Sequence, residues 1–452
     1  MSMTLFLTVF SGLSIIYLLL GYFASRNIKT TNDYFLAGRD LGIASVTFTL
    51  IATQLGGGML LGTSQEAHSV GLYGILYTLG MGFGFLILGL GFAQKLRSLN
   101  VATTAELFET RYGSPILKKF ASILSIVTLC GILIAQIVAV KGLLVGLGIT
   151  NEFLFIAFWV FVILYTMLGG LKAVVITDIF QVLYIIFLFG FIFLYSLWQE
   201  PSNFFTLANI GQAQSMFGTT AITMSSFTGT LLMPALFSLI EQDLAQRFFA
   251  ARTTRIAAIS ALLSSCFLLL FSLVPIYFGM KAQLLGITLP DSASPLLPVI
   301  EFLTNNIISS LALCGVIAAI TSTADSLLCA ISSNIAQDFD FPFIDNKNKL
   351  WLSQAITLIT GCVAVAASYF VPQNIISILI GSYEVSVSCL LVPLLFCYFK
   401  TRVKKQAAVG AIVFGLAGFV LFRILPLPQS IPRELATLAL SVIGYLIGSK
   451  KF

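Results

Sequence analysis

Apolar segments long enough to cross a membrane follow one another along this 452-residue chain almost to its end. About 20 apolar residues span a bilayer as an α-helix. Only 9% of the residues are charged, whereas about a quarter are charged in an average soluble domain. The pattern predicts an all-α polytopic membrane protein, because a transmembrane barrel would instead show short strands of alternating hydrophobicity.

Hydropathy predicts thirteen helices within a single membrane domain. Their cores are 4–23, 42–62, 71–93, 119–146, 151–168, 173–198, 223–243, 256–280, 306–336, 351–371, 375–399, 407–425 and 432–449. The first apolar run is too long for the core of a typical signal peptide, so it is expected to remain as a helix. None of the predicted loops is long enough for a separate soluble domain.

Positive charge predicts the orientation of the chain. Loops on one predicted side hold 20 of the 24 Lys and Arg residues, Arg247 among them, and such an excess marks the cytoplasmic side. The exceptions are Lys141, Lys281, Arg423 and Arg433. With thirteen spans, the N-terminus is expected outside and the C-terminus in the cytoplasm, in a plasma membrane such as the bacterial inner membrane. The net charge of +6 follows from these loops and does not indicate a nucleic-acid partner.

Three consecutive glycines, Gly56, Gly57 and Gly58, lie inside the predicted helix 42–62. One interpretation is that the helix breaks there. Unwound backbone at bilayer depth is tolerated only where it lines a cavity or is buried in protein, and secondary transporters use such breaks to hold ions and anionic substrate groups. The other interpretation is that the glycines allow close helix packing. Both remain open from spacing alone.

Ionisable residues inside predicted spans are the second unusual feature, since they are costly there and usually functional. They are Asp178, Glu241, Asp325 and Glu384. Ser322, Asp325 and Ser326 have i, i+3, i+4 spacing and share one helix face. Their hydroxyl and carboxylate oxygens are hard ligands that suit hard cations.

Structural roles are the alternative for several of these residues. Asp178 lies near the start of its predicted helix and is a candidate cap. Glu241 and Asp243 are followed closely by Arg247 and are also compatible with a cytoplasmic position. Lys141, near the end of the predicted helix 119–146, is compatible with a side chain that snorkels to the membrane surface.

Six stretches of the chain together carry a family resemblance. They are YFLAGRDLG (34–42), IATQLGGGMLLGT (51–63), TTAELFETRYG (103–113), YTMLGGLKAVVITDIFQ (165–181), DLAQRFFAAR (243–252) and AAITSTADSLLCAISSNIAQDF (318–339). In order and spacing they resemble the solute:sodium symporter family, which includes bacterial proline, pantothenate, sialic-acid and sugar symporters. The resemblance runs from about residue 34 to 340, and the remainder fits by helix count.

The resemblance implies the inverted five-plus-five helix repeat of the leucine-transporter type. The first repeat would be 42–198 and the second 223–399, with 4–33 and 407–449 peripheral. The helix 223–243 would be the second broken helix, interrupted at Gly229 and Pro234.

The resemblance also implies a sodium site between two helices. Carbonyls of Ala52, Leu55 and Ala319 would hold Na⁺ together with the hydroxyls of Ser322 and Thr323. A second cation site, or the inner sodium path, would use the residues that match the family's aspartate and its neighbours, Asp178, Asp325 and Ser326. Some members have serine where this chain has Asp325. The aspartate carboxylate would strengthen a second cation site or bind a proton instead.

The family places the substrate beside the first helix break. The matching residues here are Gln54, Gly56, Gly57, Gly58 and Met59. A site poor in side chains must use backbone N–H groups, which suit a carboxylate, and Gly58 and Met59 lack the polar groups of sugar-transporting members. Glu241 and Glu384 are candidates for an ammonium group, and Lys141 matches a basic position of the proline-type members.

These features predict a secondary transporter, not an enzyme. No GxxxxGK[ST] loop and no nucleophile–base pair occurs in the sequence. We expect sodium-coupled symport into the cell of a small organic solute, an amino-acid-like zwitterion or a small organic acid, by alternating access in the bilayer. A monomer would suffice. The alternatives are a proton-coupled symporter of the same fold and a membrane solute sensor that does not transport.

Overall fold

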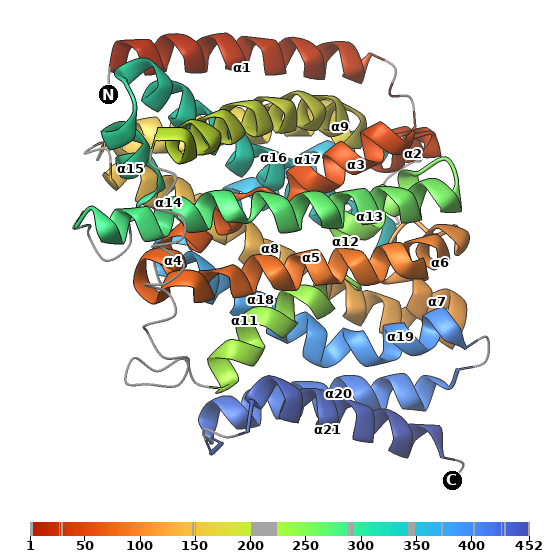
Figure 1. Cartoon of the computed structure of the whole chain (residues 1–452). Coiled ribbons are helices and arrows are strands. Elements are labelled where there is room, and N and C mark those ends of the chain that lie inside the picture. The colour runs from red at the N-terminus through yellow and green to blue at the C-terminus, as the bar shows by residue number, and fades with distance from the viewer. Residues whose placement is uncertain are drawn as a thin grey trace.

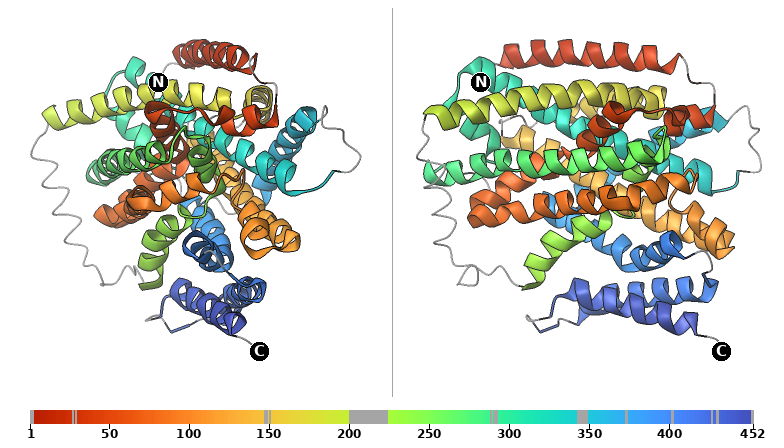
Figure 2. Two further views of the ribbon diagram at one scale, coloured as in Figure 1. Left: turned by 90° about the vertical axis from the view of Figure 1, so that its right-hand side faces the viewer. Right: turned by 45° about the vertical axis from the view of Figure 1, so that its right-hand side comes forward.

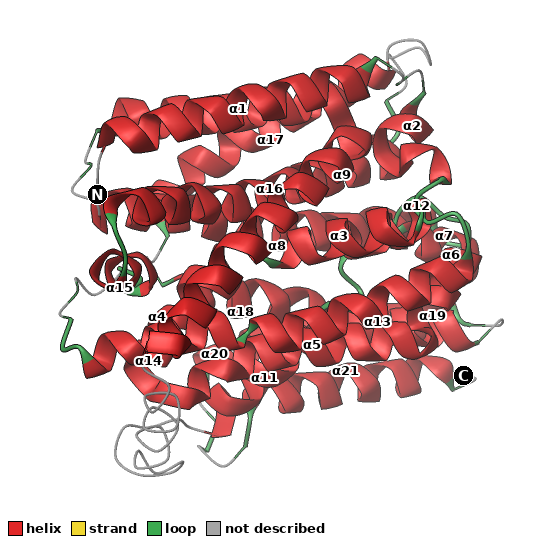
Figure 3. Ribbon diagram, turned by 45° about the horizontal axis from the view of Figure 1, so that its top comes forward, coloured by secondary structure: helices red, strands yellow, loops and turns green. Residues whose placement is uncertain are grey.

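The computed structural model describes residues 3–26, 28, 30–146, 149, 151–199, 224–287, 289, 293–341, 349–371, 374–400, 403–425, 427–428 and 431–450. Nearly all of the predicted loop 199–222 lies outside these residues, as do Lys29, Lys347, Arg402 and Lys451 among the basic residues that predict orientation. The described part of the chain is helical, apart from its connecting loops and one isolated bridge between Leu41 and Ala251 (Figure 3).

The helices bear the labels of Figure 1. In chain order the α-helices are α1 (Met3–Ser25), α2 (Thr31–Leu36), α3 (Ile43–Gln54), α4 (Thr63–Val70), α5 (Leu76–Ile87), α6 (Ala93–Ser98), α7 (Glu106–Tyr112), α8 (Pro115–Gly146), α9 (Glu152–Gln199), α11 (Met224–Phe237), α12 (Gln242–Ala250), α13 (Thr254–Phe271), α14 (Leu273–Leu284), α15 (Leu296–Leu303), α16 (Asn306–Asp338), α17 (Lys349–Ala367), α18 (Ile375–Ser386), α19 (Val392–Phe399), α20 (Lys405–Ile424) and α21 (Arg433–Ser449). Short 3-10 or π-helical turns join several of them.

Where the structure describes them, all thirteen predicted ranges lie mainly on helical segments, which confirms the all-α fold class. Within the described residues, eight helical stretches are long and apolar enough to cross a membrane. The number of thirteen spans stays a prediction. The predicted helices 151–168 and 173–198 lie on one element, α9, which is divided at Gly170, where the backbone is non-helical with φ 52° and ψ −162°. A left-handed φ of this kind favours glycine.

The helices run side by side in a bundle, with α1 along one edge and the α20–α21 pair along the opposite edge (Figures 1 and 2). The inner helix is α16, which packs against α8 and α9. In its most apolar window 83% of the residues are buried within the protein, whereas the value is 33% for α20. This burial places α16 at the centre of the bundle and α20 at its rim.

The first predicted helix break is present. Helix α3 ends at Gln54, the chain is irregular at Leu55 and Gly56, and a π-helical turn at Gly58–Gly62 leads into α4. The glycines also allow close packing, because a Cβ on Gly57 would lie 2.7 Å from the Cβ of Ala139. Both interpretations of the three glycines therefore hold at once.

The second break lies later in the chain than Gly229 and Pro234 predict. Helix α11 contains both residues and continues to Phe237. The chain then forms a turn with i→i−3 spacing, in which the Ile240 N–H donates to the Phe237 carbonyl at 2.9 Å. Glu241 has an extended backbone before α12 begins. Pro234 lacks the helical N–H and disfavours a helix interior, yet α11 continues past it, and the N–H and hydroxyl of Ser238 both donate to its carbonyl.

Candidate functional site: an oxygen cluster and a cavity at two helix breaks

An oxygen cluster joins the end of α3 to the middle of α16. Ser322 Oγ donates to the Ala52 carbonyl at 3.1 Å and to the Ala319 carbonyl at 2.9 Å. Thr323 Oγ1 lies 3.3 Å from the Ala52 carbonyl oxygen and 3.1 Å from that of Thr53. All five residues are buried. The structure thus brings together Ala52, Ala319, Ser322 and Thr323, four of the five residues predicted to hold sodium.

The donor set of this cluster fits a monovalent hard cation. Its ligands are neutral carbonyl and hydroxyl oxygens, which suit ions such as Na⁺ more than soft or transition metals. The Ala52 carbonyl is available because α3 ends two residues later, so the regular helical donor is missing. Leu55, the fifth predicted ligand, is buried beside the break, and its N–H donates to the Ile51 carbonyl at 2.9 Å.

The predicted inner sodium path contains an arginine. Arg247, which the charge pattern placed in a cytoplasmic loop, is fully buried in α12. Its Nε donates to Thr49 Oγ1 at 3.0 Å, its Nη2 donates to Ser326 Oγ, and Nη2 lies 3.9 Å from Asp178 Oδ2. Thr49 Oγ1 in turn donates to Asp178 Oδ2 at 2.5 Å. Asp178 is thus a buried partner of α3 and α12, in the interior of α9, and not a helix cap.

Asp325 faces a different helix from its two predicted partners. Its carboxylate accepts hydrogen bonds from Tyr165 Oη and, at 2.6 Å, from Thr166 Oγ1, both on the first half of α9. Ser322 faces Ala52, and Ser326 faces Arg247. Within the described residues no basic side chain forms an ion pair with Asp325. The face predicted from the i, i+3, i+4 spacing therefore contacts three separate partners.

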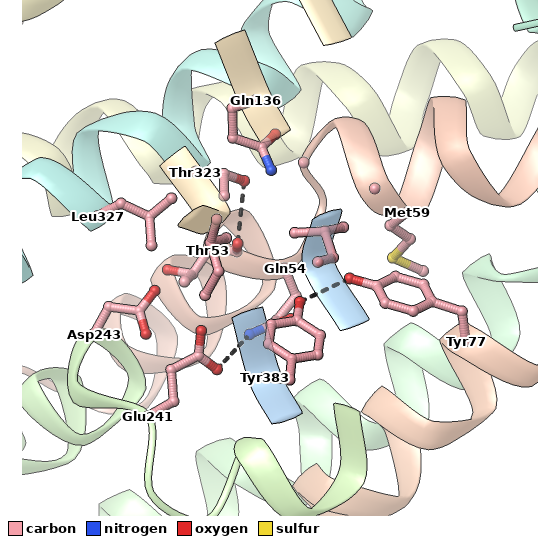
Figure 4. A pocket seen from close by; sticks show the side chains of 14 residues that line it. Thr53, Gln54, Met59, Tyr77, Gln136, Glu241, Asp243, Thr323, Leu327 and Tyr383 are labelled. Carbon is pink, nitrogen blue, oxygen red and sulfur yellow. Dashed lines mark hydrogen bonds between the residues drawn. The ribbon is translucent and has the colours of Figure 1, made fainter. Parts of the chain in front are cut away.

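A small cavity lies beside the oxygen cluster, between the two helix breaks (Figure 4). Of the predicted substrate residues, it is lined by Gln54, Gly56, Gly58, Met59 and Glu241. Lining residues that sequence reasoning missed include Thr53, Tyr77, Gln136, Asp243 and Tyr383, and Thr323 lines it as well. The cavity volume of about 20 Å³ is sufficient for one water molecule, so a solute requires the lining side chains to move.

The cavity wall is held by hydrogen bonds across the breaks. Gln54 Nε2 donates to Glu241 Oε2 at 3.4 Å, which joins the first broken helix to the second. The hydroxyls of Tyr77 and Tyr383 are 2.9 Å apart. Gln136 Oε1 accepts the Gly57 N–H at 2.7 Å, so this backbone donor, which sequence reasoning offered to a carboxylate, already has a partner from α8.

Two predicted substrate residues lie away from this cavity. Glu384 Oε2 lies 3.1 Å from Arg423 Nη2 and 3.6 Å from Arg433 Nη2, which ties α18 to the α20–α21 pair. Lys141 Nζ lies 3.9 Å from Glu152 Oε1 and 4.2 Å from the ring centroid of Tyr369, and it lines a separate cavity of about 140 Å³. The structure gives both residues structural partners and does not bring them to the helix breaks.

Comparison with known proteins identifies the family. The profile of the sodium:solute symporter family matches residues 34–415. The chain belongs to the sodium:solute symporter family. The family consists of sodium-coupled transporters and not of enzymes, and the eight apolar helices among the described residues agree with a multi-pass membrane protein. The match extends the resemblance found in the sequence beyond residue 340 to include α17–α19.

Individual relatives support the assignment. The chain is 23% identical over 388 residues to a high-affinity choline transporter of Drosophila melanogaster, covering 79% of this chain and 61% of that relative. It is 24% identical over 441 residues to the high-affinity proline transporter PutP of Bacillus subtilis, covering 90% and 89%. A solved Na⁺-coupled sialic acid symporter in an outward-open state has a TM-score of 0.79 at 19% identity, over 98% of this chain and 97% of that one. The chain spans about 61% of the length of the first of these relatives.

The structural likeness confirms the fold of the leucine-transporter type. The repeat boundaries 42–198 and 223–399 stay predictions. Membership of the family supports sodium and a small molecule as the transported partners. It does not identify the solute of this chain, the number of ions or the orientation in the membrane.

Proposed function

We propose that this symporter carries a small organic solute into the cell together with sodium by alternating access. Sodium would be held by the carbonyls of Ala52, Leu55 and Ala319 and the hydroxyls of Ser322 and Thr323. The observation that carries the proposal is that Thr323 belongs to both sites: its hydroxyl contacts the Ala52 and Thr53 carbonyls, and its side chain lines the cavity.

Coupling follows from this shared position. A cation between Ala52 and Ser322 would hold the end of α3 against α16, and Thr53 and Gln54, which come next in the chain, line the cavity. Sodium would therefore organise the solute site before the solute binds, and by linkage the solute would raise the affinity for sodium by the same factor. The membrane potential would add about 2.3 kcal/mol per charge for each 100 mV.

The direction of transport rests on the charge pattern of the loops, with the N-terminus outside and the C-terminus in the cytoplasm of a plasma membrane. Sodium would leave towards the cytoplasm past Asp178, beside which Arg247 is buried. The inward electrical and chemical gradient of sodium would favour binding outside and release inside, and so drive the cycle in this direction.

Asp325 supports a second ion in the same fold. A buried carboxylate that has only hydroxyl donors around it is costly unless a cation or a proton neutralises it. We infer that Asp325 binds either a second cation or a proton. Uptake at saturating sodium, measured with and without an inward proton gradient, separates these alternatives, because only a proton site makes uptake depend on that gradient.

The solutes named for the relatives differ widely and include choline, proline, iodide and vitamins. The solute of this chain must therefore be argued from its own cavity. A small organic acid has little support, because Lys141 and the Gly57 N–H have other partners. An amino-acid-like zwitterion is compatible with the cavity through its ammonium group.

The sodium part of the proposal is testable without knowledge of the solute. The melting temperature of the purified chain should rise with NaCl and saturate, relative to KCl at equal ionic strength, because a ligand that binds the folded state stabilises it. Equal melting temperatures in the two salts would contradict sodium binding at this site.

A further inference from the structure

We propose that the solute carries a positively charged nitrogen and that Glu241 and Asp243 bind it. The inference rests on the proposed function, since it names the class of solute that the symporter would carry. Both residues lie where the second helix breaks, both line the cavity, and their exposed fractions are 6% and 1%. Figure 4 shows the two carboxylates on the same side of the cavity.

The two carboxylates have few partners of their own. Glu241 Oε2 accepts from Gln54 at the long distance of 3.4 Å, and Asp243 Oδ1 accepts the Leu244 N–H at 2.9 Å. Asp243 Oδ2 is buried and accepts no hydrogen bond. Within the described residues neither carboxylate forms an ion pair. Two like charges in a buried site are unfavourable unless a cation or proton neutralises them.

The nearest basic residue in the chain is engaged elsewhere. Arg247 follows Asp243 by one helical turn, but its Nη1 donates to the Asp243 backbone carbonyl at 2.7 Å and its remaining nitrogens contact Thr49 and Ser326. None of the residues that line the cavity is basic. The sodium cluster at Ala52 and Ser322 contains no carboxylate, so an ion held there does not bind Glu241 or Asp243 directly. The charge of Arg247 attracts both carboxylates through space but does not pair with either of them.

Aromatic rings complete a site suited to an ammonium ion. The rings of Tyr77 and Tyr383 line the cavity, and Tyr383 stacks on Phe237 with ring centroids 4.6 Å apart. Ring faces attract organic cations, and the attraction is larger in a desolvated site. A carboxylate or phosphate group would instead meet Glu241 and Asp243 without a basic side chain to bind it.

The cationic group is either an ammonium with N–H donors or a quaternary ammonium. Pairs of ligands that have nearly the same shape but differ in charge test the need for a cation, and ethanolamine tests the need for N–H donors. The purified full chain is assayed by thermal shift in NaCl and in KCl. Choline is compared with its neutral isostere, in which a tert-butyl group replaces trimethylammonium. Glycine betaine is compared with tert-butylacetate in the same way, and ethanolamine supplies the N–H donors.

We expect choline or ethanolamine, or both, to raise the melting temperature in NaCl, with smaller shifts in KCl. The apparent affinity should exceed that of the neutral isostere on the order of tenfold or more, as expected when a buried charge gains its partner. Betaine should bind more weakly than choline, because its carboxylate would meet the two acidic residues. Glu241→Gln should abolish the ligand shift while the sodium shift remains.

The exposed Glu152 offers a matched control, since Glu152→Gln makes the same chemical change outside the cavity and should preserve both shifts. A neutral isostere that binds as tightly as choline would overturn the inference, and so would binding of tert-butylacetate alone. A sodium shift without any shift from choline, ethanolamine or betaine would also overturn it, while the sodium site would stand. If NaCl does not raise the melting temperature of the wild type relative to KCl, the proposed function itself is contradicted.

Discussion

Gln136 Oε1 on α8 accepts a hydrogen bond of 2.7 Å from the backbone N–H of Gly57, directly after the irregular residues Leu55 and Gly56 that follow α3. A buried backbone donor without a partner is costly, and at bilayer depth water does not replace it. The glutamine side chain therefore stabilises the break itself, while it also lines the cavity.

Replacement of Gln136 by methionine should destabilise the protein and impair uptake. The change keeps a similar volume but leaves the Gly57 N–H without an acceptor, at a cost of about 1–3 kcal/mol. The measurement is the melting temperature of the purified variant together with solute uptake in proteoliposomes. Gln199→Met, at the exposed end of α9, is the matched control. A wild-type melting temperature in Gln136→Met would contradict this role.

The glycines at the break should not tolerate a methyl group. A Cβ on Gly56 would lie 2.8 Å from Gln136 Oε1, and one on Gly57 would lie 2.7 Å from the Ala139 Cβ. Overpacking of this kind costs about 1–3 kcal/mol. Gly56→Ala and Gly57→Ala should therefore lower the melting temperature and uptake. Gly21→Ala in α1 meets no atom within 4 Å and should be neutral or slightly stabilising; equal effects at all three positions would sink the argument.

Arg247 should be required for stability as well as for transport. Arg247→Met leaves the buried Asp178 without its cation, and such a change costs roughly 3–5 kcal/mol. The double variant Arg247→Met/Asp178→Asn should recover part of the loss, because the uncompensated charge is removed. The exposed Arg252 pairs with Asp40 at 2.6 Å, and Arg252→Met should leave the melting temperature unchanged. A double variant as unstable as Arg247→Met would exclude the charge explanation.

The ion pairs of Glu384 distinguish a structural role from a role in solute binding. Glu384→Gln should lower the melting temperature by a few degrees, because it weakens the contacts of α18 with Arg423 and Arg433. The solute concentration for half-maximal uptake should stay as in the wild type, since Glu384 does not line the cavity. A large rise in that concentration without a change in stability would return Glu384 to the substrate site.

The sequence could predict features that depend on local composition. The apolar runs predicted where the helices lie. The three glycines indicated the first break, because glycine weakens a helix and lets a neighbouring helix approach the backbone closely. The motif around Ser322 and Thr323 led to the oxygen cluster through the family resemblance. The position of the second break was not predictable, since Pro234 is tolerated within α11 and the chain breaks only after Phe237.

Partners that are distant in sequence could not be predicted. Glu384 is a predicted substrate ligand because an ionisable residue in a span is usually functional, and Lys141 because it matches a basic position of the proline-type members. Their partners Arg423 and Glu152 lie on other helices, so neither contact could be predicted from the sequence. The same limit applies to Gln136, which carries no periodic signal within an apolar helix. Arg247 belonged to a basic segment by composition, and only packing against α3 and α16 reveals its burial.

The most direct test of the central claim is the binding of radioactive sodium to the purified protein without solute. We predict saturable binding to the wild type. Ser322→Ala and Thr323→Val each remove one hydroxyl oxygen that faces the ion, and a hydrogen bond to a charged group contributes about 1.5–3 kcal/mol. By analogy, the affinity should fall about tenfold or more in both variants. Ser310→Ala, whose hydroxyl bonds only to the Asn306 carbonyl within α16, should bind sodium as the wild type does. Unchanged sodium affinity in both Ser322→Ala and Thr323→Val would contradict the account.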